Sequence, residues 1–350
     1  ENVRPKGIQW AIAGRNENKL KHRQAQIKQN YSQEVEIITV DPSSETSLEA
    51  MAAQAEVVIT TVGPYAEYGE PVLRACLLAE SDYLDITGEP EFVNEMMRKY
   101  AAQAERRGVL AINCCGFDSI PADLGTYFTV KNLPKEEDKK VYSYVFSSGT
   151  FSGGTWNSAI KAMSKAFQGE NPLFKHGAPR LDFHYANDIN RWAIPMPVID
   201  QDIVFRSSKS LSYAPNFSYG QFIGLPHIAQ ALGITVAVSG IFLGAQIPPV
   251  RDFLLDQVKP GTGPSLEKRQ ESFFELLFIG ESPSKKILTR VNGGDPGYGD
   301  TAKMVSEAAL LMATQRDGLL QKSGIHTPAS VFGDKLVEAL DAKGITFRVI

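Results

Sequence analysis

The sequence has little cysteine, few histidines and no excess of basic charge, and each shortage excludes a class of protein. Three cysteines among 350 residues argue against a disulfide-stapled scaffold and favour a reducing compartment. The five histidines have no metal-ligand spacing, so we predict no metal site. A net charge of −4 lacks the clustered basic face of nucleic-acid-binding proteins, and we expect no nucleic-acid partner.

The motifs of several common enzyme classes are also missing. No G-x-S-x-G, Walker A or H-E-x-x-H pattern occurs, which leaves serine-nucleophile, P-loop and zinc-hydrolase chemistry without support. No secretory signal peptide is visible. With 43% hydrophobic and 22% charged residues, the composition is that of a globular protein long enough for two domains.

The first 130 residues alternate strand-like and helix-like segments. Short apolar runs such as 35–40 and 57–62 end at turn-forming residues and are separated by amphipathic segments such as 93–107. This alternation predicts βαβ units that form a parallel sheet with helices on both faces. We therefore expect a doubly wound, Rossmann-type α/β domain over residues 1–130.

The earliest strand-like segment is typical of the second strand of such a domain. Residues 7–15 (GIQWAIAGR) form a short apolar run that ends at Gly14-Arg15, where a second strand meets the adenosine ribose. We expect the first strand, with the Gly-rich turn that binds the pyrophosphate, to belong upstream and to be absent from this chain. A gap, or a separately supplied strand, should therefore lie beside residues 7–15.

The pattern changes near residue 131, and we predict a second domain of α+β type over residues 131–320. The charged turn 135–140 (KEEDKK) marks the boundary, and a helix is expected at 155–167. Residues 321–350 are treated as a separate C-terminal segment. One interpretation is that this segment packs back against the first domain.

The longest stretch without charge runs from residue 210 to residue 250 and contains no Asp, Glu, Lys or Arg. As a helix, its centre at 228–247 would span about one hydrocarbon core, roughly 30 Å. One interpretation is a buried core helix or a subunit interface, such as that of a homodimer. We favour the other, a monotopic segment on a membrane or lipid droplet, which enters the lipid and returns. The expected points of return are Gly233, Gly240 or Gly244.

Arg15 indicates the choice of cofactor. Enzymes that prefer NAD place Asp or Glu at the end of the second strand, whereas this strand ends in Gly14-Arg15. Gly14 would let the adenosine approach the backbone, and a guanidinium can bind a 2′-phosphate through two parallel hydrogen bonds. The alternative is an ordinary exposed arginine. We favour NADP over NAD.

Three further turns are expected at the same sheet edge, where ligands bind in open α/β sheets. Thr61-Val62-Gly63-Pro64 would free backbone groups to face the nicotinamide, or it is a plain turn that ends a strand. The run 85–90 (DITGEP), which contains Gly88, either positions a substrate or caps the next helix. Gly116-Phe117, followed by Asp118-Ser119, has the same two interpretations. Convergence of four turns on one edge is better evidence than any one of them.

Seven runs stand out together: AGRNENKL (13–20), TVGPYAEYGEPVLRAC (61–76), DITGEPEF (85–92), CGFDSIPADLG (115–125), GTWNSAIKAM (154–163), GDPGYGDTAKM (294–304) and HTPASVFG (326–333). The chain resembles the saccharopine dehydrogenase-like oxidoreductases in these runs, over nearly its whole length. The resemblance implies a Rossmann domain, an inserted α/β domain and a nonpolar segment at 228–247. It also implies NAD(P)-dependent oxidoreductase activity and an association with membranes and lipid droplets. Lysine chemistry is not implied.

We therefore expect an NADP-dependent oxidoreductase that acts on an unidentified hydrophobic small molecule by hydride transfer. No motif defines a proton donor, and Tyr65, Asp118 and Tyr298 are candidates only by location. The alternative is a non-catalytic lipid- or pigment-binding protein, or a structural lipid-droplet protein, on the same fold. The expected location is the cytoplasmic side of a membrane or lipid droplet.

Overall fold

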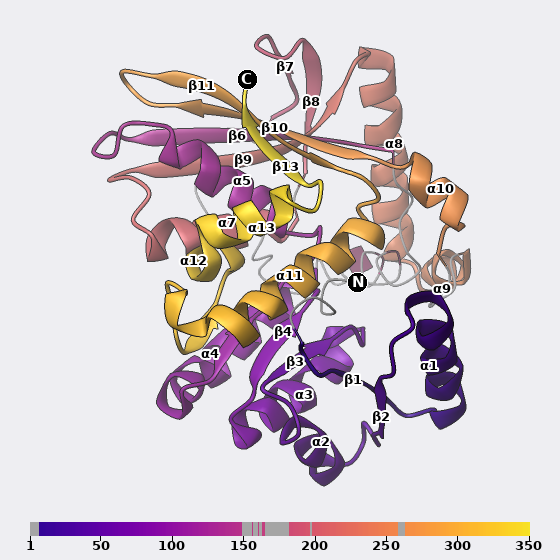
Figure 1. Ribbon diagram of the computed structural model, residues 1–350. Helices are drawn as coiled ribbons and strands as arrows, with labels where there is room; N and C mark the ends of the chain where they lie inside the picture. Colours follow the sequence, from indigo (N-terminus) through magenta and orange to yellow (C-terminus); the bar gives the residue numbers. More distant parts are fainter. Residues whose placement is uncertain are drawn as a thin grey trace.

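The computed structural model describes residues 7–148, 182–196, 198–257 and 263–350, together with Trp156, Ile160, Met163 and Ser164. These residues form three β-sheets with helices around and between them (Figure 1). The helix expected at 155–167 lies largely outside the described residues.

A two-stranded parallel sheet comes first along the chain. β1 (Ala11–Gly14) pairs with β2 (Glu36–Thr39), and α1 (Glu17–Tyr31) connects them. The side chain of Asn16 caps α1, because its Oδ1 accepts a hydrogen bond from the Lys19 amide at 3.0 Å. This β1–α1–β2 unit has the parallel pairing that the alternating sequence predicted.

A four-stranded parallel sheet follows, in the order β12, β5, β4, β3. Three of its strands come from the alternating region: β3 (Val57–Thr60), β4 (Asp82–Asp85) and β5 (Leu110–Ile112). The fourth, β12 (Gly324–His326), lies in the C-terminal segment 321–350, and no strand was predicted at these residues. The helices between the first strands are α2 (Glu45–Ala52), α3 (Tyr65–Ala79) and α4 (Pro90–Arg107).

β1 and β3 each have an edge that no described strand covers. Among the described residues, β1 pairs only with β2 and β3 pairs only with β4. Ile59 in β3 is 41% exposed, which is unusual for an apolar β-branched residue of a parallel sheet. These open edges are compatible with the gap predicted beside residues 7–15, which stays a prediction.

The third sheet has seven strands and is mainly antiparallel, with one parallel pair between β6 and β9. This mixed sheet confirms the second, α+β part of the predicted fold. Its strands, in spatial order, are β13 (Thr346–Val349), β11 (Lys286–Gly293), β10 (Phe274–Glu281), β6 (Lys139–Ser147), β9 (Phe217–Leu225), β8 (Arg191–Pro195) and β7 (His184–Ala186).

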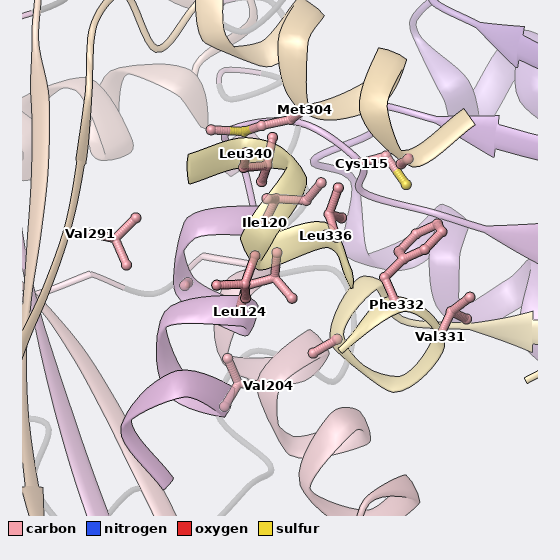
Figure 2. Close-up of a cluster of buried hydrophobic side chains, with 14 of the residues drawn as sticks. Cys115, Ile120, Leu124, Val204, Val291, Met304, Val331, Phe332, Leu336 and Leu340 are labelled. Atoms are coloured by element: carbon pink, nitrogen blue, oxygen red, sulfur yellow. The ribbon is translucent and has the colours of Figure 1, made fainter. Parts of the chain in front are cut away.

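The two larger sheets share one hydrophobic core. Leu84 and Ile112 of the four-stranded sheet belong to the same buried cluster as Phe278 and Val291 of the seven-stranded sheet. Figure 2 shows side chains of this cluster gathered around α5 (Ile120–Lys131). The other helices that contribute to it are α7 (Asp200–Ser210), α11 (Gly299–Gln315), α12 (Pro328–Phe332) and α13 (Asp334–Asp341).

The C-terminal part of the chain contributes to both larger sheets. β12 pairs with β5, and β13 pairs with β11. Helix α11 lies against β3 and β4, with the short helix η3 (Arg316–Gly318) directly after it. The domain boundaries near residues 130 and 320 stay predictions.

The charge-free stretch divides into a buried strand and an exposed helix. β9 lies inside the seven-stranded sheet, whereas α8 (Ile228–Ala245) is exposed at the right of the view in Figure 1. Among the described residues, α8 is the one helix whose length and composition would suit a membrane span. Only Ala231 and Ala245 of α8 are buried. The interpretation as a buried core helix is therefore wrong, and the prediction of an exposed helix is confirmed.

The chain does not return within α8, and the prediction of a return at Gly233, Gly240 or Gly244 was wrong. The helix continues through all three glycines, because a glycine in a helix interior costs only about 1 kcal/mol relative to alanine. The chain turns at residues 246–247, before α9 (Pro248–Gln257). Proline lacks the amide that would continue α8 but suits the first turn of a new helix. A short helix, α10 (Leu266–Glu271), comes later.

Two glycine substitutions should have opposite effects on stability. A Cβ at Gly125 in α5 would overlap the ring of Phe278, whereas a Cβ at Gly240 in α8 would have no atom within 4 Å. We expect Gly125→Ala to lower the free energy of unfolding by ~1–3 kcal/mol through overpacking. The matched control, Gly240→Ala, should be neutral or stabilising. Urea denaturation measures both, and equal midpoints for the two variants would contradict this packing.

Candidate functional site

Three of the four predicted turns lie together at the carboxyl edge of the four-stranded sheet. Gly63, Gly88 and Gly116 follow β3, β4 and β5, which are parallel neighbours. A Cβ at Gly88 would lie 3.0 Å from Oδ2 of Asp118, and one at Gly116 would lie 3.4 Å from Cβ of Ile86. The turns after β4 and β5 therefore pack directly on each other, with glycine at the points of close approach.

The buried carboxylate of Asp85 joins the ends of β4 and β5. Its Oδ2 accepts hydrogen bonds from the Tyr83 hydroxyl at 2.9 Å and from Nδ2 of Asn113 at 2.6 Å. Its Oδ1 accepts from the amides of Thr87 at 3.1 Å and Cys114 at 2.9 Å. Burial raises the pKa of Asp85 to about 6, although these hydrogen bonds act in the opposite direction. Asp85 thus has a structural role.

Glu89 caps the helix that follows the first of these turns. Its Oε1 accepts from the Tyr65 amide at 3.0 Å, and its Oε2 accepts from the Ala66 amide at 2.9 Å. A carboxylate is favourable at the N-terminus of α3, where amides have no partner within the helix. The prediction that this run caps the next helix was wrong for Glu89, because its carboxylate makes no cap hydrogen bond to α4 (Pro90–Arg107) and bonds to α3 instead.

The turn at Gly116-Phe117 is tied to the start of α11. The amide of Phe117 donates to Oγ1 of Thr301 at 3.0 Å, and that hydroxyl donates to the carbonyl of Pro296 at 2.7 Å. The ring of Phe117 packs edge-on against Phe274, with 5.1 Å between centroids. Sequence reasoning missed Thr301 as a support of the site, although it lies within the noted run 294–304.

Two carboxyl groups lie close together beside these turns. Asp118 is half-buried, and burial raises the pKa of its carboxyl group. Asp200 of α7 is fully buried, and burial together with the nearby Asp118 charge raises its pKa to about 7. Asp200 accepts hydrogen bonds from Nε2 of Gln221 at 2.6 Å and from Oγ of Ser119 at 3.4 Å. No sequence motif indicated Asp200, because it comes from a distant helix.

The other two proton-donor candidates differ from Asp118 in their surroundings. The Tyr65 hydroxyl is buried and donates to the carbonyl of Thr60 at 3.0 Å. Burial also raises the pKa of Tyr65 far above its usual value. These contacts argue for a structural role of Tyr65. The ring of Tyr298 lies 5.7 Å from the guanidinium of Arg269, and its hydroxyl lies beside Gly263.

Gly14 and Arg15 follow β1 and belong to the separate two-stranded sheet. The guanidinium of Arg15 is exposed and makes no hydrogen bond or ion pair within the described part of the chain. The three atoms nearest to a Cβ at Gly14 all belong to the Leu20 side chain, at 3.5–3.9 Å, which is ordinary contact. Thr61, Val62 and Gly63, after β3, are also exposed. A free guanidinium and open backbone suit the 2′-phosphate and adenosine of NADP.

Comparisons with known proteins identify the family and the fold of the chain. Residues 2–112 match the family model of the saccharopine dehydrogenase NADP-binding domain. A solved structure of saccharopine dehydrogenase (L-Glu forming) from Saccharomyces cerevisiae has the same fold, with a TM-score of 0.57 and 12% sequence identity. The superposition covers 98% of this chain and 94% of the yeast chain.

Curated relatives match over most of their own length. A saccharopine dehydrogenase-like oxidoreductase of Bos taurus is 31% identical and covers 98% of this chain and 90% of the relative. A lipid droplet localized protein of Caenorhabditis elegans is 30% identical, and the match covers 98% of this chain and 92% of the relative. A putative trans-acting enoyl reductase of Mycobacterium tuberculosis is 32% identical, and the match covers 89% of this chain and 84% of the relative. The chain belongs to the saccharopine dehydrogenase-like oxidoreductases and has the NADP-binding domain of that family.

Proposed function

We propose that this protein is an NADP-dependent oxidoreductase for a substrate that joins a reacting carbonyl or enoyl group to an apolar body. The observation that carries the proposal is the packing of glycine turns beside Asp118 at the carboxyl edge of the sheet. Ligands of open α/β sheets bind at this edge. The enoyl reductase name of one relative supports the substrate class.

Different residues of the chain would bind different parts of NADP. Arg15 and Gly14 would hold the adenosine 2′-phosphate and the adenosine itself. The backbone of Thr61, Val62, Gly63 and Pro64, with Gly88, Gly116 and Phe117, would line the nicotinamide side. NADP, when bound, supplies or accepts the hydride. The chain's own contribution is to orient the two reactants and exclude water.

Asp118 is the side chain that we assign as proton donor. It lies against Gly88, makes no hydrogen bond within the described residues, and is half-buried beside Asp200. Its raised pKa favours the protonated form that a donor needs. In the reduction of an enoyl group, a hydride adds to the β-carbon and the proton of Asp118 adds to the α-carbon. Solvent then returns a proton to the carboxylate.

Substitution of Arg15 tests the cofactor assignment. We expect Arg15→Asp to weaken NADP binding by about tenfold or more, because a charge-assisted contact with the phosphate is lost and a like charge replaces it. NAD, which has no 2′-phosphate, should bind almost equally to both proteins. Fluorescence titration with each dinucleotide gives the dissociation constants. Arg98→Asp, at an exposed arginine of α4, is the control, and equal losses for NADP and NAD would refute the assignment.

Substitution of Asp118 tests the chemistry. With NADPH and trans-2-enoyl thioesters of increasing chain length, Asp118→Asn should lower kcat by about a hundredfold or more, while NADPH binding is retained. In the wild type, kcat should fall as pH rises through the raised pKa of Asp118, because the donor loses its proton. The variant should lack this fall. Asp41→Asn, at an exposed turn after β2, is the control.

The same assay decides between the enzyme and the non-catalytic alternative. Thioester binding without NADPH oxidation by the wild type would favour a lipid-binding protein on this fold. Turnover that is unaffected by Asp118→Asn would leave the enzyme assignment standing and remove Asp118 from the reaction.

We further propose that α8 places the protein on a lipid surface. Leu232, Val236 and Leu243 are 54%, 72% and 61% exposed, and their spacing puts them on one face of the helix. The helix has no charged residue, which favours an apolar environment for this face. The name of the Caenorhabditis elegans relative supports a lipid droplet.

Replacement of these three residues by glutamine should detach the protein from lipid. We expect at least a tenfold loss of binding to droplets with a triacylglycerol core and a phospholipid monolayer, since each buried side chain contributes ~1.5–3 kcal/mol. Flotation measures the bound fraction. The control replaces three exposed apolar residues of other elements, Leu266, Leu320 and Val349, by glutamine. If the α8 variant keeps its lipid binding and instead dissociates a dimer on gel filtration, a second copy covers α8.

A further inference from the structure

An open cleft at the surface, of about 610 Å³ and called the cavity below, lies apart from the glycine turns. It is bounded by α4, α7, the end of β12 and the start of α12, and Figure 1 shows these three helices on the left of the view. None of its lining residues belongs to the candidate cofactor site. Its volume is within the range of small-molecule pockets, and its use does not depend on the proposed function.

Part of the cavity wall is apolar and comes from three different elements. Met97 of α4, Phe205 of α7 and Ile325 of β12 contribute to it. Phe205 and Ile325 belong to the hydrophobic cores, with 8% and 4% of their surface exposed, so their positions are fixed by packing. This wall suits the hydrocarbon part of a ligand.

Another part of the wall carries an unmatched positive charge. Asp202, Arg206 and Lys209 are spaced along one face of α7. Arg206 is paired with Asp202, with 3.0 Å between Nη2 and Oδ2, and it also contacts Asn94 and Met97 of α4. Lys209 is exposed, and no carboxylate within the described residues pairs with it. The ion pair cancels two of the three charges, so Lys209 supplies the net positive charge.

The polar groups between these walls differ in their availability. The hydroxyls of Thr327 and Ser330 bond to each other at 2.8 Å and to the turn that starts α12, so both are used in the fold. The Nε2 atom of His326 lies 2.8 Å from the carbonyl of Ser323, to which it donates. Nδ1 of the neutral ring is then left as an acceptor, without a partner among the described residues. Ser210, next to Lys209, adds a hydroxyl that is also free there.

We propose that this cavity binds a small ligand in which a carboxylate or phosphate is joined to an apolar body. The anionic group lies at Lys209 and Ser210, and the apolar body lies against Met97, Phe205 and Ile325. A protonated oxygen of the ligand, where present, donates to Nδ1 of His326. A cationic ligand is disfavoured by Lys209.

Binding of simple amphiphiles to the full chain tests the ligand class. We expect isothermal titration calorimetry to show one saturable site for octanoate and weaker binding of acetate, which cannot contact the apolar wall. Octylammonium, of similar length but opposite charge, should not bind to this site. Octyl phosphate separates the two anion sources: tighter binding than octanoate indicates a phosphate ligand, and weaker binding indicates a carboxylate.

Substitutions then place the site. Lys209→Glu should weaken octanoate binding by about tenfold or more, equivalent to ~1.4 kcal/mol, whereas Lys209→Arg should retain it. Lys140→Glu, at an exposed lysine of β6, is the matched control. Asp118→Asn, at the candidate cofactor site, should leave octanoate binding unchanged, so failure here is distinct from failure of the proposed function.

Three outcomes would overturn the proposal. They are the absence of octanoate binding to the wild type, binding that Lys209→Glu leaves unchanged, and binding that Asp118→Asn abolishes. Circular dichroism confirms that each variant is folded, and Lys209→Gln replaces the charge reversal if that variant is not.

Discussion

The carboxylate of Asp85 is the interaction on which the candidate site depends. It is buried, and its four hydrogen bonds fix the ends of β4 and β5 relative to each other. A buried carboxylate is stable only when its oxygens are bonded in this way. Because the turns at Gly88 and Gly116 start from these strand ends, their close approach follows from the Asp85 contacts. Asp85 therefore positions the two turns relative to each other.

The site is also held by parts of the chain far from it in sequence. The hydroxyl of Thr301 accepts a hydrogen bond from the Phe117 amide, and Asp200 lies beside Asp118. Thr301 and Asp200 both come from segments after residue 131. The hydrophobic core shared by the two larger sheets makes these contacts possible, because it fixes α7 and α11 against the carboxyl edge. The second part of the chain therefore completes the site and does not merely flank it. The same packing forms the cavity beside α4 and α12.

The charge-free stretch 210–250 contains one buried segment and one exposed segment. β9 buries its apolar residues between β6 and β8, while α8, only a few residues later, exposes most of its own. An exposed apolar face of this size is unfavourable in water, which is the physical reason to expect a lipid or protein surface against it. Both segments lack charged residues, so charge alone does not separate core from surface, and their place relative to the sheet does.

Local features could be predicted from the amino-acid sequence: the βαβ alternation before residue 130, the strand-end turns and the uncharged segment. These follow from hydrophobic period, turn-forming residues and motif runs, which act over short distances. Tertiary structure decided the rest. It showed Glu89 to be a helix cap and Tyr65 a buried structural residue, brought β12 into the first sheet, and placed Asp200 and Thr301 at the site. The hydrogen bonds of Asp200 and Thr301 join residues more than 80 positions apart, and no local pattern specifies them because each depends on how the whole core packs.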